Sequence, residues 1–341
     1  MKIAAVALLL AFAVQQKVPT LEPGASAPDF DLPGVDGKRH ALKDFAAAKL
    51  LLIVFTCNHC PTAIAYEGRI KKLVEDYKDK GVTLVAINPN SSAGLRLDEL
   101  GYTDLGDSFE EMKIRARDAA FNFVYLHDGD TEEVSKKYGP QATPHCFLFD
   151  RERKLRYVGR IDDNEHEKDV KVHDLRNAID ALLEGKEPPV AKTKPMGCST
   201  KWAEKSDSVK RYMEKLAAEP VTLDERDVES AAPKLRLTYV WSLGSEESTR
   251  QFGEFVTMNR MYRQRKFEFV SVSLDPPEKK EDVLAFLKKE QASNRNLMAS
   301  LKEKAPTTIL LGPGGETIYR KEGAVDPLEV RRAIVKALGV R

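Results

Sequence analysis

Two cysteines separated by two residues, Cys57 and Cys60, are the residues best suited to do chemistry in this chain of 341 residues. A Cys-x-x-Cys pair can close into a disulfide and reopen, so it can pass two electrons to or from another thiol. The apolar run 50–55 before the pair is typical of a strand buried on both faces. Apolar residues then recur at helical spacing as far as Tyr77, and Gly81 follows as a stop. The cysteines are therefore predicted to lie at a strand-to-helix turn.

The predicted turn favours a reactive sulfur. Unpaired amide N–H groups and the positive end of the helix dipole stabilise a thiolate at the start of a helix. Reactive cysteines in such places have pKa values of roughly 3.5 to 7.5, against about 8.5 for a free cysteine. We expect Cys57, in the position that is normally more exposed, to attack and Cys60 to resolve the mixed disulfide. His59 is expected to stabilise the Cys57 thiolate, with a solvated surface histidine as the alternative.

Two further cysteines, Cys146 and Cys198, bring the total to four. Cys146 lies in an apolar stretch, where a buried and inert thiol is expected. Cys198 follows Pro195 in a tail and is flanked by Gly197 and Ser199, so it is expected to be exposed enough to react. A third redox cysteine, a structural partner of Cys146 and an idle thiol all stay open for it. Spacing supports only the pairing of the two cysteines at the turn.

A metal site is an alternative interpretation of the same residues. Cys57, Cys60, His59 and His145 could gather around a soft ion such as Cu(I) or zinc. We favour redox chemistry and predict neither a metal nor another bound cofactor.

The N-terminus predicts export. Residues 1–13 have a single Lys2 before an apolar run and an A-x-A-like cleavage site at Ala11-Phe12-Ala13, as in a secretory signal peptide. The run is too short for a dependable membrane span. A formal net charge of +1 gives no general attraction to nucleic acid or to an anionic membrane. We expect a periplasmic or extracellular protein without a stable membrane span, and nothing in the sequence specifies an oligomeric state.

The elements after the cysteines alternate between strands and helices. A second buried strand is expected over 82–88, and Ser108 is expected to cap a helix after a loop that ends at Asp107. A short strand over 123–126, a helix over 131–138 and a strand up to Asp150 follow. This order predicts an α/β domain over residues 20–202, with a mainly parallel sheet covered by helices.

This domain resembles the thioredoxin fold in its redoxin branch, the alkyl-hydroperoxide-reductase/thiol-specific-antioxidant (AhpC/TSA) type, which overlaps with TlpA-like thioredoxins. The motifs that carry the resemblance are Ala27-Pro28-Asp29-Phe30, Phe55-Thr56-Cys57-Asn58-His59-Cys60-Pro61, Thr143-Pro144 and Gly197-Cys198-Ser199-Thr200-Lys201-Trp202. The resemblance implies a central mixed sheet flanked by helices. It also implies a thiol-disulfide oxidoreductase that exchanges disulfides with a protein substrate and with a thiol redox partner.

The resemblance further implies that Pro144 is a cis-proline facing the cysteine pair. In that fold the proline exposes the backbone of Thr143, so that an extended substrate can pair with it beside Cys57. The alternative is that Pro144 only opens a strand.

The chain departs from the family pattern at two places. Leu51 stands where thioredoxins often carry a buried carboxylate, which leaves Glu67 as a weak candidate for taking the proton of Cys60. A peroxiredoxin has a threonine three residues before its reactive cysteine, and Val54 stands in that position before Cys57. A peroxiredoxin-like thiol peroxidase is therefore a weaker alternative, and a copper- or zinc-binding chaperone without turnover is another.

The rest of the chain predicts a helical linker over 203–232 and a second thioredoxin-like domain over 233–341. A strand that ends at Trp241 and a later Pro306 repeat the order of the first domain. Aligned on Trp241, the two cysteine positions hold Ser245 and Ser248, so this domain is predicted to be redox-inactive and to dock a partner or shield the first domain. A hydrolytic role for Ser245 has little support, because no histidine follows His173.

Overall fold

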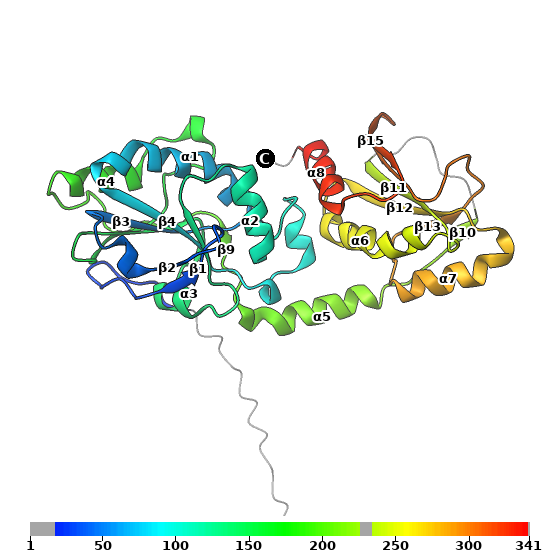
Figure 1. Ribbon diagram of the computed structural model, residues 1–341, viewed down its shortest axis with the longest axis horizontal. Coiled ribbons are helices and arrows are strands. Elements are labelled where there is room, and N and C mark those ends of the chain that lie inside the picture. Colours follow the sequence, from blue (N-terminus) through cyan, green and yellow to red (C-terminus); the bar gives the residue numbers. More distant parts are fainter. Residues whose placement is uncertain (1–17, 226–233, 340–341) are drawn as a thin grey trace, which may run out of the picture.

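The computed structural model describes residues 18–225 and 234–339. It shows two α/β halves, and helix α5 (Ser206–Ala217) runs from one to the other along one side (Figure 1). The predicted signal peptide, residues 1–13, lies outside the described residues. Helix α5 lies within the segment 203–232 that was predicted to be a helical linker. In the part of the chain that the structure describes, no helix combines the length and the apolar character needed to cross a bilayer.

The first half is built on a five-stranded mixed sheet in the order β5-β4-β3-β7-β8. Strand β4 is parallel to β3 and β5, whereas β7 is antiparallel to β3 and β8. The sheet is therefore more evenly mixed than the expected, mainly parallel one. The strands of this half, with those of the N-terminal hairpin and a separate two-stranded ladder, are β1 (Asp31–Pro33), β2 (Arg39–Ala41), β3 (Leu50–Phe55), β4 (Val82–Asn88), β5 (Val124–His127), β6 (Ala142–Thr143), β7 (His145–Phe149), β8 (Leu155–Gly159) and β9 (Cys198–Ser199).

Helices and loops cover both faces of this sheet, which is why all six residues of β3 are buried. One face packs against side chains of α1 and α4, such as Ile70 and Leu175, and the other against α3 and the first hairpin, such as Tyr138 and Phe30. The helices of this half are α1 (Pro61–Tyr77), α2 (Phe109–Asp118), α3 (Glu133–Tyr138) and α4 (Asp174–Leu183). Short 3-10 turns complete the chain at η1 (Leu42–Phe45), η2 (Lys78–Lys80), η3 (Ser92–Gly94), η4 (Leu97–Leu100), η5 (Glu167–Asp169), η6 (Ala203–Lys205) and η7 (Pro277–Lys279).

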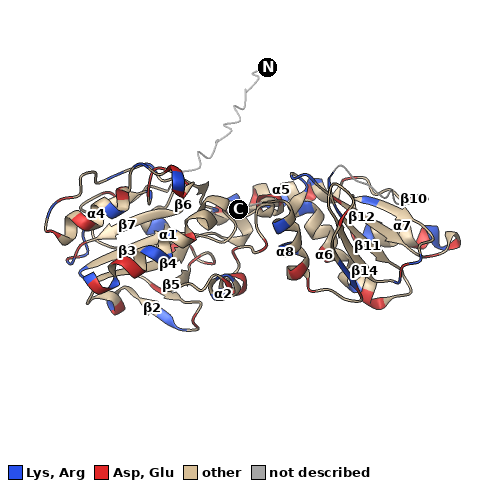
Figure 2. Cartoon of the chain, turned by 90° about the horizontal axis from the view of Figure 1, so that it is seen from above, with Lys and Arg blue, Asp and Glu red and all other residues tan. Residues whose placement is uncertain are grey.

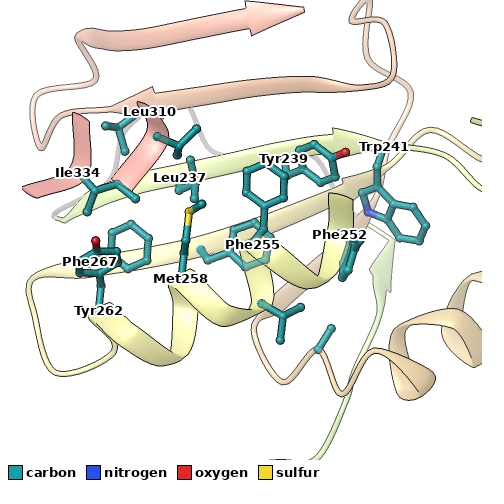
Figure 3. Close-up of a cluster of buried hydrophobic side chains, with 14 of the residues drawn as sticks. Leu237, Tyr239, Trp241, Phe252, Phe255, Met258, Tyr262, Phe267, Leu310 and Ile334 are labelled. Atoms are coloured by element: carbon teal, nitrogen blue, oxygen red, sulfur yellow. The ribbon is translucent and has the colours of Figure 1, made fainter. Parts of the chain in front are cut away.

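The second half contains a six-stranded sheet in the order β10-β13-β12-β11-β14-β15. Aromatic side chains of α6 pack on β11, where the rings of Tyr239 and Phe255 stack with centroids 4.0 Å apart (Figure 3). Ile334 of α8 joins the same core. The elements are β10 (Asp224–Glu225), β11 (Leu235–Trp241), α6 (Glu246–Tyr262), β12 (Phe267–Ser273), α7 (Lys280–Lys289), β13 (Arg295–Met298), β14 (Thr307–Leu311), β15 (Thr317–Glu322) and α8 (Pro327–Ala337).

The two sheets share one topology around their central strands. In both, the cysteine- or serine-bearing turn follows the central strand. Strands parallel to the central strand lie on one side of it, β4 and β5 in the first sheet and β12, β13 and β10 in the second, and the antiparallel pairs β7–β8 and β14–β15 lie on the other side. Both Pro144 and Pro306 follow a cis peptide bond immediately before the antiparallel neighbour of the central strand. The structure therefore confirms the predicted α/β class with mixed sheets flanked by helices, and the second half repeats the strand order of the first around its central strand.

The strand register corrects the predicted alignment of the two domains. Phe55 lies opposite His145, the residue after Pro144, and Val240 lies opposite Thr307, the residue after Pro306. Counting on from Phe55 and Val240, the positions of Cys57 and Cys60 correspond to Ser242 and Ser245, and not to Ser245 and Ser248. The helix starts agree with this correspondence, because α6 begins directly after Ser245, just as α1 begins directly after Cys60. Both corresponding positions still hold serine.

The second half meets the first at the loop between β4 and α2. Leu97 and Leu100 of η4 pack on the core of the second half, and the Tyr262 hydroxyl donates to the Thr103 carbonyl at 3.1 Å. Arg332 of α8 lies 3.2 Å from Asp104. Seen from above, α6 and α8 face the first half, and acidic and basic residues are interspersed over both halves (Figure 2).

Candidate active site

The two cysteines of the Cys-x-x-Cys pair lie at the predicted turn between β3 and α1. Cys60 is the N-cap of α1, and its sulfur accepts a hydrogen bond from the Ala63 N–H at 3.4 Å. The sulfur of Cys57 lies 3.0 Å from the Thr143 hydroxyl. Both residues are buried, with exposed fractions of 2% for Cys57 and 0% for Cys60. Cys57 is thus more exposed than Cys60 by only a small margin, and both side chains are closed off from solvent.

Cys198 is brought to the same place. Strand β9 pairs antiparallel with β6, so that Cys198 lies opposite Thr143, the residue before Pro144. The Cys198 N–H donates to the Cys60 sulfur at 3.3 Å, and the partly buried side chain of Cys198 packs against the cluster of Cys57, Cys60 and Ala63. Cys146 lies instead in the core formed with α1 and α4, where burial raises the pKa of its thiol. None of the four cysteines is in a disulfide, and the structure brings Cys198 to the pair and not to Cys146.

The segment 197–202, which we call the strap, is held down by specific contacts. The Thr200 hydroxyl donates to the Pro140 carbonyl at 2.8 Å, and the Lys201 N–H donates to Asn90 Oδ1 at 2.8 Å. Gly197 has a φ of +144°, and a Cβ there would lie 1.9 Å from the Thr143 carbonyl oxygen. The strap can reach β6 because this position is glycine. Its contacts explain why both sulfurs of the pair are covered.

A buried histidine and aspartate lie behind the pair. His59 Nδ1 is 2.5 Å from Asp107 Oδ2, and both side chains are almost inaccessible, with exposed fractions of 2% and 0%. The surface alternative for His59 is therefore wrong. Asp107 Oδ1 also accepts from the Asn58 N–H at 2.8 Å. Sequence reasoning placed Asp107 only at the end of a loop, and no local spacing connects it with His59.

The His59 and Asp107 side chains shift each other's pKa in opposite directions. Burial alone lowers the pKa of His59, but the charge of Asp107 and its hydrogen bond raise that pKa above its usual value. Burial alone raises the pKa of Asp107, but the charge and hydrogen bond of His59, together with hydrogen bonds from Asn90 and Asn58, lower it. The ionised pair is thereby favoured over a wide pH range.

The local donors place negative charge on Cys60. Hydrogen bonds from the Cys198 and Cys57 thiols, and from the backbone N–H groups of Ala63 and Cys198, lower the pKa of Cys60 to about 2. The Thr143 carbonyl, 3.3 Å from the Cys60 sulfur, opposes this because it accepts only from a protonated thiol, but the donors outnumber it. Burial, with the Cys60 thiolate and Asp107, raises the pKa of Cys57. With the strap in place, the thiolate is therefore on Cys60 and not on Cys57 as expected.

The predicted metal ligands do not all come together. Among the described residues, Cys57, His59 and Asp107 offer donor atoms that all lie within 4.8 Å of one another. His145 is not in this set: its Nδ1 accepts from the Gln141 N–H at 3.2 Å, and burial lowers its pKa to about 3. Because His59 and Asp107 already bond to each other, an ion would have to separate them.

Glu67 is not placed to take the proton of Cys60. Its two carboxylate oxygens accept from the guanidinium of Arg115 on α2 at 2.7 and 2.8 Å. This bidentate pair ties α1 to α2 and occupies the carboxylate.

Comparison with known proteins identifies the first half. Residues 22–179 match the family model described as Redoxin. This segment of the chain is therefore similar to the redoxin family. A curated relative, the thiol-disulfide oxidoreductase ResA of Bacillus thuringiensis subsp. konkukian (strain 97-27), is 26% identical over 137 residues, which cover 40% of this chain and 68% of the relative.

Two solved structures are similar to about half of the chain at higher identity. A hypothetical protein from Sinorhizobium meliloti 1021 is 34% identical, with a TM-score of 0.48, and the match covers 54% of this chain and 96% of that one. An uncharacterized conserved protein from Geobacillus kaustophilus is 38% identical, with a TM-score of 0.47, and the match covers 53% of this chain and 92% of that one.

The second half supports the loop that carries Asp107 of the redoxin domain. The Tyr262 hydroxyl holds the Thr103 carbonyl, and the Thr103 hydroxyl in turn lies 3.2 Å from the carbonyl of Asn58. Arg331 of α8 lies 3.4 Å from Glu111, which accepts from the Gly106 N–H at 2.9 Å. Both connections reach a residue next to His59 or Asp107.

Proposed function

We propose that this redoxin is an exported thiol-disulfide oxidoreductase that exchanges disulfides with protein substrates through Cys57 and Cys60. The observation that carries the proposal is the pair of adjacent sulfurs at the N-terminus of α1, backed by the buried His59 and Asp107. A cysteine at a helix N-terminus beside charged partners is the usual setting of a redox-active thiol. The comparisons support the general redox class through the Redoxin model and the ResA relative.

The exchange takes place in two steps. The Cys57 thiolate attacks a substrate disulfide, so that a bond forms between Cys57 and one substrate sulfur while the other substrate sulfur leaves as a thiolate. Cys60 then attacks Cys57, which closes the Cys57–Cys60 disulfide and releases the second substrate thiol. Reduction by a separate thiol redox partner restores the pair.

The two cysteines are suited to different roles in these steps. Cys60 is held against the helix by the Ala63 N–H and has no exposed surface, which suits a resolving thiolate. Cys57 lies beside the Thr143 hydroxyl and close to the His59 and Asp107 pair. We propose that His59 stabilises the Cys57 thiolate that forms when the strap leaves, since an imidazolium within a few ångströms favours the charged sulfur.

Export rests on the predicted signal peptide of residues 1–13. Stable disulfide chemistry suits an oxidising compartment such as the periplasm or the cell exterior. N-terminal sequencing of the protein from a fractionated producing cell tests this: a chain that starts after Ala13 outside the cytoplasm is expected, and an intact Met1 in the cytoplasm contradicts it.

The redox equilibrium of the pair tests the proposed function. Protein with Cys146→Ala and Cys198→Ser is equilibrated with glutathione buffers, and its free thiols are trapped and counted by mass. A two-electron couple is expected. A potential near about −120 mV identifies a disulfide donor, and one near about −270 mV a reductant. If Cys57 and Cys60 form no disulfide at any redox potential of the glutathione buffer, the proposal is wrong.

A thiol peroxidase is the second candidate, favoured by one contact. The Thr143 hydroxyl, 3.0 Å from the Cys57 sulfur, stands where a hydroxyl could orient a peroxide. In that reaction the thiolate attacks one peroxide oxygen, the O–O bond breaks, and Cys57 becomes a sulfenic acid that Cys60 converts to a disulfide with loss of water. Thiol loss with hydrogen peroxide that is rapid in the wild type and abolished by Thr143→Val supports this candidate; thiol loss no faster than for free cysteine overturns it.

A further inference from the structure

The edge of β6, which an extended substrate was expected to use, is already occupied by the protein's own chain. Strand β9 pairs with β6 so that Cys198 lies opposite Thr143 and Ser199 opposite Ala142. A substrate strand and the strap cannot both pair with Thr143. The strap therefore stands in the place of a substrate and presents a cysteine there.

The sulfur of Cys60 lies between two other sulfurs. It contacts the side chains of both Cys57 and Cys198, and it also accepts the Cys198 N–H at 3.3 Å. Cys57, Cys60 and Ala63 form one buried cluster, and the partly buried Cys198 packs against it. A sulfur in this position can form a disulfide with either neighbour.

We propose that Cys198 is a third redox cysteine and that the strap is an internal substrate, which accepts the disulfide from the Cys57–Cys60 pair. This proposal rests on the proposed function. In the step, the Cys198 thiolate attacks the Cys60 sulfur of the Cys57–Cys60 disulfide. The Cys60–Cys198 bond forms, the Cys57–Cys60 bond breaks, and Cys57 leaves as a thiolate. The proton that Cys198 releases to water is balanced by the proton that Cys57 takes up, and no external oxidant is needed.

The charges on the three cysteines agree with transfer of the disulfide from the Cys57–Cys60 pair to Cys198. In the reduced protein the contact with Cys60 raises the pKa of Cys198, because Cys60 carries the negative charge. In the Cys57–Cys60 disulfide that charge is gone, so Cys198 ionises more easily and faces an electrophilic sulfur. The product locks the strap on β6 and returns Cys57 to its thiol form, which gives an oxidised state closed to external substrates.

Tryptic mapping of the full-length oxidised protein tests the proposal. Cleavage places Cys57 and Cys60 on one peptide, 50–69, and Cys198 on another, 193–201, since the Lys194–Pro195 bond resists trypsin. A Cys57–Cys60 disulfide leaves these peptides separate, whereas a Cys60–Cys198 disulfide joins them. Wild type, Cys57→Ser, Cys57→Ala, Cys60→Ser and Cys198→Ser are oxidised in glutathione buffers, quenched in acid and digested. Cys146→Ala is the matched control, because it removes a cysteine outside the cluster.

We expect the joined peptides from wild type, from both Cys57 variants and from Cys146→Ala, and at least ten-fold less from Cys60→Ser. Far-ultraviolet circular dichroism confirms that each variant is folded. If Cys198→Ser closes its pair while both folded Cys57 variants keep Cys60 and Cys198 as free thiols in the same glutathione buffer, the internal-substrate proposal is wrong and the proposed function stands. If Cys198→Ser does not close while the Cys57 variants give the joined peptides, the proposed function is wrong, and with it the transfer from the pair.

Discussion

The turn after the central strand is built alike in the two halves of the chain but carries different chemistry. Cys60 caps α1 through a hydrogen bond to the Ala63 N–H, and Ser245 caps α6 through one to the Ser248 N–H at 3.2 Å. In both halves the helix begins on the next residue, and a cis-proline directly precedes the antiparallel neighbour of the central strand. Either side chain can therefore serve as the N-cap, but only sulfur can also carry electrons.

A carboxylate supports both turns, and the residue beside it differs. Asp107 accepts the N–H of Asn58, and Asp275 accepts the N–H of Leu243, the corresponding residue, at 2.9 Å. The next residue is His59 in the first half and Gly244 in the second. The turn is thus stabilised by a carboxylate in both halves, whereas the imidazole of His59 is present only in the half whose turn carries ionisable cysteines. Among the described residues, the second half also has no counterpart of the strap.

The largest expected effect comes from exchanging sulfur for oxygen at equivalent positions. Cys57→Ser is expected to reduce disulfide exchange to the uncatalysed rate, because a hydroxyl cannot form the mixed disulfide. Ser242→Ala, the equivalent change in the second half, is expected to leave the rate unchanged. Turbidity of insulin during reduction by dithiothreitol measures both. A comparable loss in Ser242→Ala would show that the two halves do not differ in this way.

The same comparison can be sharpened by adding cysteines to the second half. Ser242→Cys with Ser245→Cys is expected to close a disulfide in glutathione buffer more readily than Ser245→Cys with Ser248→Cys, because the strand register makes the first pair equivalent to Cys57 and Cys60. Trapping the free thiols and measuring the mass of each double variant gives the fraction in which the disulfide has formed. Preferential closure of the second pair would contradict the register.

The next largest effect is expected at the two carboxylates that support the turns, the buried Asp107 and the partly buried Asp275. Asp107→Asn leaves His59 without its charged partner, and breaking a buried ion pair in this way costs about 3–5 kcal/mol of unfolding free energy. Asp275→Asn is the matched change in the second half and is expected to cost only about 1–3 kcal/mol, the penalty for a hydrogen bond to the backbone. Urea unfolding measures both, and equal losses would show that the pairing with His59 adds nothing.

The pH dependence of stability should report the pairing of Asp107 with His59 as well. The lowered pKa of Asp107 gives a contribution that is present above its usual value of 3.8 and is lost as the pH falls through the folded-state pKa. The raised pKa of His59 gives one that is present below 6.5 and is lost as the pH rises through its folded-state pKa. The contribution of the pair to the unfolding free energy is therefore greatest between these two pH values. Asp107→Asn is expected to reduce the variation of the unfolding free energy with pH. If the variant shows the same dependence of unfolding free energy on pH as the wild type, this prediction is wrong.

A smaller effect is expected from loosening the strap. Gly197→Ala places a Cβ against the Thr143 carbonyl, which should push the strap off β6 and increase the rate of iodoacetamide labelling at Cys57 and Cys60 several-fold. Gly185→Ala is the control, because Gly185 also has a positive φ, of +75°, but a Cβ there would meet no atom within 4 Å. Each change costs about 1 kcal/mol from backbone strain. Equal labelling rates in the two variants would show that the strap does not shield the pair.

The smallest effect is expected where the second half supports the loop of the first. Tyr262→Phe removes the hydrogen bond to Thr103 and is expected to cost about 0.5–1.5 kcal/mol. If the second half helps to position Asp107, the NMR titration of His59 should shift toward lower pH in this variant. Arg320→Gln, far from the loop and paired with Glu303, is the control and should leave the His59 titration unchanged.

The local pattern of apolar residues, prolines and cysteines in the sequence determined much of the fold and the positions of some of the site residues. The apolar run of β3, the helical period of α1 and the prolines before β7 and β14 all act on near neighbours in the chain, so the strand-to-helix turns and the repeated order of elements were predictable. The positions of Cys57, Cys60 and Thr143 follow from that order. The resemblance to redoxins added the expectation that Pro144 faces the pair.

Tertiary structure alone decided which distant groups meet at the pair. Asp107 reaches His59, and Cys198 reaches Cys60, only because strands and loops far apart in the chain fold to the same end of the sheet. The burial of the sulfurs, the sign of their pKa shifts and the choice of Ser242 over Ser248 all depend on those contacts and on strand register. A hydrogen bond or a shift in pKa depends on distance in space, and the spacing of residues along the chain does not contain it.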